Sequence, residues 1–213
     1  MGKSLNRAVI IGAAPFDDAA YLAAYLREDD VFIAADGGQR LLQAMGKTPH
    51  RIIGDFDSSR QPTDAPCTVL PVRKDDTDVL AALRLALDDG YREFLLLGCL
   101  GGRFDHTLAN VFLLQFLQCR GAHGILVDEN HEISLLSAGE HTVHHKDGYG
   151  FSLFPYGGNA DGVTIKDALY TTEKATFDTA FPIGVSNGFI GKPAHVCIES
   201  GHLLLVLAKK DVQ

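Results

Sequence analysis

Hydrophobic residues in the first 128 positions come in short, nearly continuous runs, separated by stretches with helical spacing. Such runs are typical of parallel strands buried on both faces, and their alternation with helices predicts a doubly wound, mostly parallel α/β sheet. The predicted strands are residues 8–11, 31–34, 51–53, 68–70, 94–97 and 125–127. The predicted helices are residues 18–26, 39–45, 77–87 and 105–119, and the last is so apolar that we expect it to be largely buried.

The helical spacing disappears after residue 130. Short apolar segments then alternate with glycine-rich turns, which predicts an all-β half. These segments are residues 132–136, 141–145, 149–154 and 162–165, and the runs 194–198 and 202–207 flank Ser200-Gly201 in a pattern typical of a hairpin. We therefore predict an α/β domain of residues 1–130 followed by a small β-sandwich domain of residues 131–213.

Four acidic segments follow apolar runs in the α/β half. Because the carboxyl ends of parallel strands meet at one edge of a sheet, their loops can converge on a single crevice. Carboxylates around such a crevice indicate a magnesium and phosphate site, since Mg²⁺ is usually held by one or two carboxylates, water and substrate phosphates. The segments are Ala35-Asp36-Gly37-Gly38, Gly54-Asp55-Phe56-Asp57-Ser58, Lys74-Asp75-Asp76-Thr77-Asp78 and Gly101-Gly102-Arg103-Phe104-Asp105-His106.

Asp55 and Asp57 come directly after a predicted strand. Residues two apart on an extended segment point to the same side, so both carboxylates can face one cation. The alternative is an Asx-turn, in which Asp57 and Ser58 bond their own backbone. We favour the metal site, because two close carboxylates near a surface repel each other by on the order of a few kcal/mol.

The segment from Lys74 to Asp78 precedes a predicted helix. The simplest alternative is helix capping, in which Asp75 or Asp76 caps the helix and Asp78 lies near its positive end. Three acids beside Thr77 exceed that need, so we expect at least one to have a functional role. Lys74 can reach a phosphate as a point charge.

A glycine-rich turn at residues 98–102 joins a predicted strand to the apolar helix. Glycines permit close approach of the backbone to a ligand, and the start of a helix presents unpaired N–H groups. Arg103 adds a planar donor fork suited to phosphate. A plain turn with a solvated arginine is the alternative, but the neighbouring Asp105 and His106 favour a binding site.

Two further patterns suggest chemistry that their context does not support. The segment 184–188 matches G-x-S-x-G, but a nucleophile elbow must lead from a strand into a helix, and this segment lies in the all-β half. His141, His144 and His145 suggest zinc, but on a strand His144 points away from the other two. The sequence has no G-x-x-x-x-G-K-[ST] segment, so nucleotide phosphates would depend on metal and side chains.

Charge and cysteine content narrow the class of partner. The formal net charge of −8 argues against nucleic-acid binding, which depends on lysine and arginine. The four cysteines are scattered without a C-x-x-C pair, which fits a reducing cytosol. No apolar run approaches the roughly 20 residues that span a bilayer, and the first residues lead into a predicted strand without a signal region. We therefore expect a cytoplasmic protein with neither membrane nor nucleic-acid partners.

The motifs ADGG, GDFDS, KDDTD, GGRFDH and VSNGF, in this order and with an α/β half before a β half, resemble the thiamine pyrophosphokinase family over nearly the whole chain. The resemblance implies transfer of a pyrophosphoryl group from ATP to the hydroxyethyl oxygen of thiamine, giving thiamine diphosphate and AMP with Mg²⁺. Such transfer depends mostly on positioning and charge neutralisation and needs no protein nucleophile. The resemblance also implies a homodimer with the thiamine sites at the subunit interface.

The resemblance assigns a role to each motif. The general base is left open, since either Asp78 or the metal and phosphate themselves can serve. Arg103 and Asp105 order the polyphosphate and its metal, with Lys74 nearby. The implied magnesium ligands are Asp55, Asp57 and Asp78. The residues implied to bind the substrates are Asp36, Gly37, Gly38, Lys74, Thr77 and His106 on the ATP side, and Ser186 and Asn187 on the thiamine side.

Two other functions remain as alternatives. A phosphohydrolase could use Asp55 as a nucleophile, but Asp55 follows the third predicted strand, later than in the haloacid dehalogenase group. A non-catalytic sensor of thiamine diphosphate would not need acids on all four loops. The sequence therefore favours the transferase.

Overall fold

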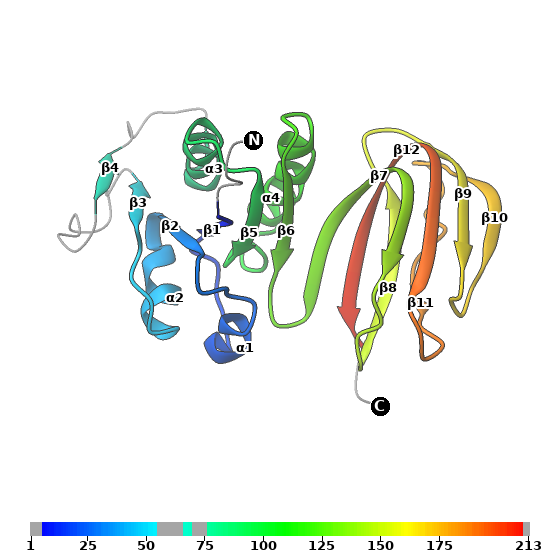
Figure 1. The fold of residues 1–213 in the computed structure, drawn as a ribbon, viewed down its shortest axis with the longest axis horizontal. Helices are drawn as coiled ribbons and strands as arrows, with labels where there is room; N and C mark the ends of the chain where they lie inside the picture. The colour runs from blue at the N-terminus through cyan, green and yellow to red at the C-terminus, as the bar shows by residue number, and fades with distance from the viewer. Residues whose placement is uncertain (1–5, 55–65, 70–75, 211–213) are drawn as a thin grey trace. The chain divides into compact units, whose positions relative to one another are not determined.

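The computed structural model describes residues 6–54, 66–69 and 76–210, and the chain divides into two compact units, Met1–Glu129 and Asn130–Gln213. Figure 1 shows helices and strands in the first unit, coloured blue to green, and strands in the second, coloured green to red. Among the described residues, the strands pair in parallel within the first unit and antiparallel within the second. The α/β class is therefore confirmed, with parallel pairing in one unit and antiparallel pairing in the other.

The first unit is a parallel sheet with the strand order β4-β3-β2-β1-β5-β6. Its strands start and end within two residues of the predicted ranges. They are β1 (Ala8–Ile11), β2 (Val31–Ala35), β3 (Arg51–Gly54), β4 (Cys67–Val69), β5 (Glu93–Leu97) and β6 (His123–Val127). The helices are α1 (Ala19–Ala23), the short 3-10 helix η1 (Asp36–Gly38), α2 (Gln39–Ala44), α3 (Asp78–Asp88) and α4 (Phe104–Gln118).

Helices cover both faces of this sheet. On one face, Val9 and Ile11 of β1 share a hydrophobic cluster with Leu22 of α1 and Leu41 of α2. On the other, α4 packs so closely that a Cβ on Gly124 of β6 would lie 2.6 Å from a methyl carbon of Leu117. Burial on both faces explains why the strands have nearly continuous apolar sequences.

The strand order reverses at β1, which pairs with β2 on one side and with β5 on the other. Two glycines close the gap beyond the carboxyl ends of these strands. A Cβ on Gly12 would lie 2.4 Å from the carbonyl oxygen of Gly98, and a Cβ on Gly98 would lie 2.5 Å from that of Gly12. In open α/β sheets, ligands bind in the crevice at this reversal.

Helix α4 is less buried than its apolar sequence predicted. Leu114 and Leu117 are buried, but Phe104, Leu108 and Phe112 are 78 %, 44 % and 54 % exposed. These three residues are spaced four apart, so they form one apolar stripe along the helix. The prediction that this helix is largely buried was wrong, because its apolar residues divide between the core and an exposed face.

The second unit is a set of antiparallel strands linked through one long strand, β12. Residues 195–200 of β12 pair with β9, residues 203–209 pair with β8, and both parts pair with β7. The strands are β7 (His131–Val143), β8 (Tyr149–Pro155), β9 (Ala160–Lys166), β10 (Thr172–Phe177), β11 (Asn187–Gly188) and β12 (Ala194–Lys209).

The predicted hairpin at Ser200-Gly201 is therefore wrong. The strand continues through this point, and its register against β7 shifts between Ile198 and His202 as in a β-bulge. The segments predicted at 132–136 and 141–145 are likewise one strand, β7. No helix of the described part of the chain is long and apolar enough to cross a membrane.

Candidate active site at the sheet crevice

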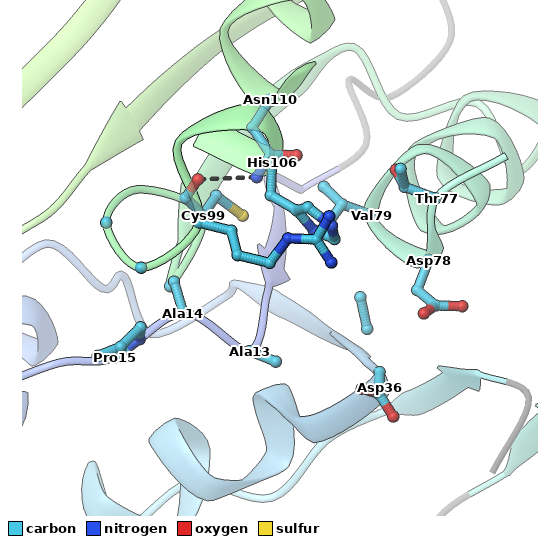
Figure 2. Close-up of a pocket in the computed structure, with 15 residues that line it drawn as sticks. Ala13, Ala14, Pro15, Asp36, Thr77, Asp78, Val79, Cys99, His106 and Asn110 are labelled. Atoms are coloured by element: carbon cyan, nitrogen blue, oxygen red, sulfur yellow. Dashed lines mark hydrogen bonds between the residues drawn. The ribbon is translucent and has the colours of Figure 1, made fainter. Parts of the chain in front are cut away.

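A crevice of about 290 Å³ lies where the strand order reverses. The segments after β1, β2 and β5 line it, together with the first turns of α3 and α4 (Figure 2). Its volume is at the lower end of the roughly 300–1,000 Å³ found for small-molecule sites. The lining residues are Ala13, Ala14, Pro15, Ala35, Asp36, Thr77, Asp78, Val79, Gly98, Cys99, Gly101, Gly102, Arg103, His106 and Asn110.

Asp36 enters the crevice from the short helix η1, directly after β2. Its φ of 47° lies in the left-handed region, which is uncommon for a residue other than glycine. The turn is held tightly against β1, since a Cβ on Gly38 would lie 2.0 Å from the carbonyl oxygen of Ile11. The backbone of Asp36 also lies beside the end of β3, because a Cβ on Gly54 would be 3.4 Å from the Cα atom of Asp36.

Thr77 and Asp78 enter from the start of α3. The Thr77 hydroxyl caps the helix by accepting a hydrogen bond from the backbone N–H of Leu80 at 3.2 Å. Asp78 occupies the first turn, where the helix dipole favours a carboxylate. In Figure 2 the side chains of Asp36 and Asp78 both lie on the side of the crevice away from Pro15. The helix cap is therefore Thr77 and not Asp76, which pairs with Arg84 at 2.6 Å; Asp75 lies outside the described residues.

Arg103 and Asp105 form a two-point ion pair at the start of α4. The Nε and Nη2 atoms of Arg103 donate to the two carboxylate oxygens of Asp105 at 3.1 and 2.6 Å. These hydrogen bonds lower the pKa of Asp105 and raise that of Arg103. Both side chains are well exposed, so the pair is accessible to an incoming anion. Arg103 lines the crevice, whereas Asp105 contacts it through Arg103.

Of the remaining predicted residues, some lie at or beside the crevice and others lie outside the described residues. His106 lines the crevice, and its backbone N–H donates to Asp105 at 3.0 Å. Gly37 borders an adjoining hollow of about 320 Å³, whose lining includes Arg40. Asp55, Asp57 and Lys74 lie outside the described residues.

Two features of the crevice were missed by sequence reasoning, and Cys99, which lies in the predicted glycine-rich turn, was not recognised as a lining residue. The loop Ala13-Ala14-Pro15 forms one wall, and only the preceding Gly12 signalled a close backbone approach. Cys99 is a buried lining residue, and burial raises the pKa of its thiol to about 12. Asn110 is an amide in an otherwise apolar part of α4, and its Nδ2 donates to the carbonyl oxygen of Cys99 at 2.7 Å. A buried asparagine in an apolar helix was the available signal.

Carboxylate oxygens are suitable magnesium ligands, and both Asp36 and Asp78 supply them to the crevice. Among the described residues no group of three or more His, Cys, Asp or Glu side chains could hold a metal ion. Asp55 follows Gly54 in the sequence, and Gly54 lies beside Asp36. The donor chemistry therefore fits magnesium, with two carboxylates described in the crevice and two further acids, Asp55 and Asp57, following Gly54 in the sequence.

In the second unit, Ser186 and Asn187 border a hollow of about 590 Å³ whose lining also includes Ser152 and Lys210. Asn187 is buried, and its amide is used within the protein. Its Oδ1 accepts from the backbone N–H of Tyr170 at 2.9 Å and its Nδ2 donates to the Tyr170 carbonyl at 2.7 Å. Ser186 has a φ of 58°, and β11 rather than a helix follows it, so the nucleophile-elbow context is absent here.

A parallel α/β sheet with carboxylates and an arginine at its reversal point is typical of enzymes that act on phosphate-bearing ligands. The family description "Thiamin pyrophosphokinase, catalytic domain" matches residues 22–123, and "Thiamin pyrophosphokinase, vitamin B1 binding domain" matches residues 140–205. Together the two matches cover most of the chain. The chain therefore belongs to the thiamin pyrophosphokinase family, whose members are transferases.

Relatives of known structure agree in fold. A curated thiamine pyrophosphokinase from Bacillus subtilis (strain 168) is 26 % identical over 212 residues, covering 96 % of this chain and 98 % of that protein. A crystal structure of thiamine pyrophosphokinase from Bacillus subtilis has a TM-score of 0.88 at 23 % identity, covering 97 % of this chain and 100 % of the other. That from Geobacillus thermodenitrificans has a TM-score of 0.82 at 25 % identity, covering 96 % and 98 %.

Proposed function

We propose that this chain is a thiamine pyrophosphokinase, which transfers the pyrophosphoryl group of ATP to the hydroxyl of thiamine to give thiamine diphosphate and AMP. Membership of the family supports the reaction. The observation that carries the assignment of the site is the convergence of Asp36, Asp78 and Arg103 on one crevice at the reversal of the strand order. Parallel strands bring these three residues together from positions far apart in the sequence.

The division of labour follows the two units. The catalytic-domain match lies within the first unit and the vitamin B1 match within the second. We assign ATP and magnesium to the α/β domain, residues 1–130, and thiamine to the β domain, residues 131–213. We propose that the β domain is a small sandwich whose strands are linked through β12. Ser186 is the thiamine-side residue, and Asn187 supports it by fixing the backbone of Tyr170.

We assign roles to the charged residues of the crevice as follows from their chemistry. Arg103 can turn its donor fork from Asp105 to the polyphosphate, because the present pair is exposed and therefore weak. The turn at Gly101 and Gly102 and the first N–H groups of α4 add donors for phosphate oxygens. Asp78 is our candidate for the base that accepts the proton of the attacking hydroxyl, with the metal and phosphate themselves as the alternative.

We assign magnesium to Asp55, Asp57 and Asp78, with Asp36 beside them and Lys74 and Thr77 on the phosphate side. When bound, the metal neutralises charge on the phosphates and orients them. The attacking oxygen forms a bond to the β-phosphorus, and the bond from that phosphorus to the oxygen of AMP breaks. AMP leaves with that oxygen, and the hydroxyl proton goes to the base.

Incubation of the purified protein with ATP, Mg²⁺ and thiamine tests the reaction, with a control that lacks thiamine. We expect AMP and thiamine diphosphate in equal amounts, and no AMP in the control. Free phosphate that does not depend on thiamine would instead indicate a phosphohydrolase. Saturable thiamine binding without turnover would indicate a sensor.

We also propose a homodimer with the thiamine site at the subunit interface. The exposed apolar stripe Phe104, Leu108 and Phe112 supports this, because it begins beside Arg103 and monomers seldom expose such surfaces without a partner. Light scattering tests it: Leu108→Glu should give a folded monomer, while Glu93→Gln at another exposed position should leave a dimer. A monomeric wild-type protein would refute the dimer.

A cytoplasmic location is proposed from the dispersed cysteines.

A further inference from the structure

The side chain of Asn110 is a buried amide whose nitrogen is hydrogen-bonded within the protein, while its oxygen is not bonded to any described residue. Asn110 is 7 % exposed and lines the crevice from the second turn of α4. Figure 2 shows its nitrogen directed at the carbonyl oxygen of Cys99, to which it donates at 2.7 Å. In the described part of the chain, no donor is paired with the Oδ1 atom of Asn110.

The orientation of this amide is fixed by its partner. Reversing the amide would place Oδ1 against the Cys99 carbonyl, where two acceptors repel each other. Nδ2 therefore stays on the carbonyl, and Oδ1 is presented on the opposite side as an acceptor. Oδ1 is not among the fully buried unpaired side-chain atoms of the described residues, so water in the crevice can reach it. A ligand that displaces this water keeps the hydrogen bond only if it supplies a donor of its own.

The chemistry of Oδ1 restricts what it can recognise. An amide oxygen accepts hydrogen bonds and cannot donate, so it does not bind ionised phosphate oxygens. The phosphate-binding groups lie elsewhere in the crevice, at Arg103 and in the turn before it. The loop after β1, Ala13-Ala14-Pro15, forms one wall of the crevice, and its residues are small and uncharged. Such walls suit a flat or uncharged part of a ligand.

We propose that Asn110 is a specificity-determining residue, whose Oδ1 accepts a hydrogen bond from an uncharged donor on the nucleotide co-substrate. The donors that ATP offers are the amino group of its base and the hydroxyls of its sugar. This inference rests on the proposed function, because it takes ATP to be the ligand of the crevice. A site built to pair with a donor discriminates against analogues that lack it.

The test compares three nucleotides with wild type and Asn110→Leu. Thr107→Val is the matched control, because the Thr107 hydroxyl also ties α4 to the same turn, donating to the carbonyl oxygen of Gly101 at 3.2 Å, but Thr107 does not line the crevice. Steady-state kcat and KM are measured with ATP, with purine riboside triphosphate, which lacks the amino group, and with 2′,3′-dideoxy-ATP, which lacks both sugar hydroxyls.

We expect Asn110→Leu to lower kcat/KM for ATP about tenfold more than Thr107→Val does, through a higher KM for ATP, with KM for thiamine unchanged. One of the two analogues should lose a similar factor with wild type and little further with Asn110→Leu. That analogue identifies which donor Asn110 binds.

Three results would overturn the inference. The first is an equal loss by Asn110→Leu with all three nucleotides, which is what a purely structural bond to Cys99 predicts. The second is a change in KM for thiamine in place of KM for ATP. The third is a loss that disappears at saturating Mg²⁺, which would make Oδ1 a metal ligand. Wild type that fails to turn over ATP and thiamine would instead refute the proposed function, so the two failures are distinguishable.

Discussion

A single methyl group on Gly38 should separate the fold of the crevice from its chemistry. A Cβ at this position would lie 2.0 Å from the carbonyl oxygen of Ile11, 2.7 Å from its carbon and 3.0 Å from the oxygen of Gly12. All three are backbone atoms of β1 and its continuation, so no side-chain rotation relieves the clash. Gly37 is the matched control, because its closest neighbours are a guanidinium nitrogen of Arg40 at 3.2 Å and the Cβ atom of Ala13 at 3.3 Å.

The size of the effect follows from these distances. Restoring an ordinary contact of about 3.5 Å requires a backbone shift of about 1.5 Å between η1 and β1. Overpacking of this kind costs about 1–3 kcal/mol, and an obstacle made of backbone favours the upper end. At roughly 2–4 °C per kcal/mol for a chain of this size, Gly38→Ala should lower Tm by about 6–12 °C.

Activity should fall with it, because Asp36 lies two residues before Gly38 in the same short helix. A misplacement of about 1 Å can cost about a hundredfold in rate, so we expect a loss of that order in kcat/KM. Thermal unfolding and steady-state kinetics measure both quantities. Gly37→Ala should change stability by less than about 1 kcal/mol, since a flexible arginine can move away. If Gly38→Ala matches Gly37→Ala in both Tm and activity, the account of η1 as a turn pressed onto β1 is wrong.

Three further predictions concern other groups. The Asp30 side chain is fully buried and pairs with Arg7 at 2.7 Å, so Asp30→Ala should lower the free energy of unfolding, measured in urea, by about 3–5 kcal/mol. Glu93→Ala removes an exposed pair with Arg27 and should lower it by about 1 kcal/mol or less, and similar losses for the two variants would contradict this. Burial raises the pKa of Cys99 to about 12, so its thiol stays protonated at pH 8. After treatment with a thiol reagent, mass spectrometry should find the exposed Cys119 labelled and Cys99 unlabelled until the protein unfolds. The hydrogen bonds from Arg103 lower the pKa of Asp105 in the folded state. The pairing therefore stabilises the folded state fully above the unfolded pKa of about 3.9, and this stabilisation is lost as the pH falls through the lower folded pKa. An NMR titration in which Asp105 titrates at or above about 3.9 would refute this.

The strands of the α/β unit were predictable because burial on both faces leaves a direct mark on their sequence. The range 8–11 was predicted for β1, and the structure has Ala8–Ile11. Helix α4 was predicted within one residue at each end, but not its exposure. Hydrophobic spacing reports that a side chain is apolar, and the same residue can face the core or a partner surface, as Leu114 and Leu108 do.

The continuous strand β12 was not predictable from its own sequence. A glycine between two apolar runs indicates a turn, and Gly201 does have a φ of 86°. The strand nevertheless continues, because its long antiparallel partner β7 offers hydrogen bonds on both sides of the bulge. Pairing with a strand about sixty residues away outweighs a local turn preference, and a single sequence holds little information on such pairing.

The candidate site divides in the same way between local and long-range information. Asp36 and Asp78 could be predicted because each follows or begins an element with a clear pattern, and parallel topology then brings them to one edge. Asn110 and the loop after β1 were not predicted, because the crevice that they line lies where Gly12 approaches Gly98, and these two residues are separated by more than eighty positions. Those two glycines leave no room for a side chain between β1 and β5. The crevice therefore depends on glycine at both strand ends as much as on the charged residues that line it.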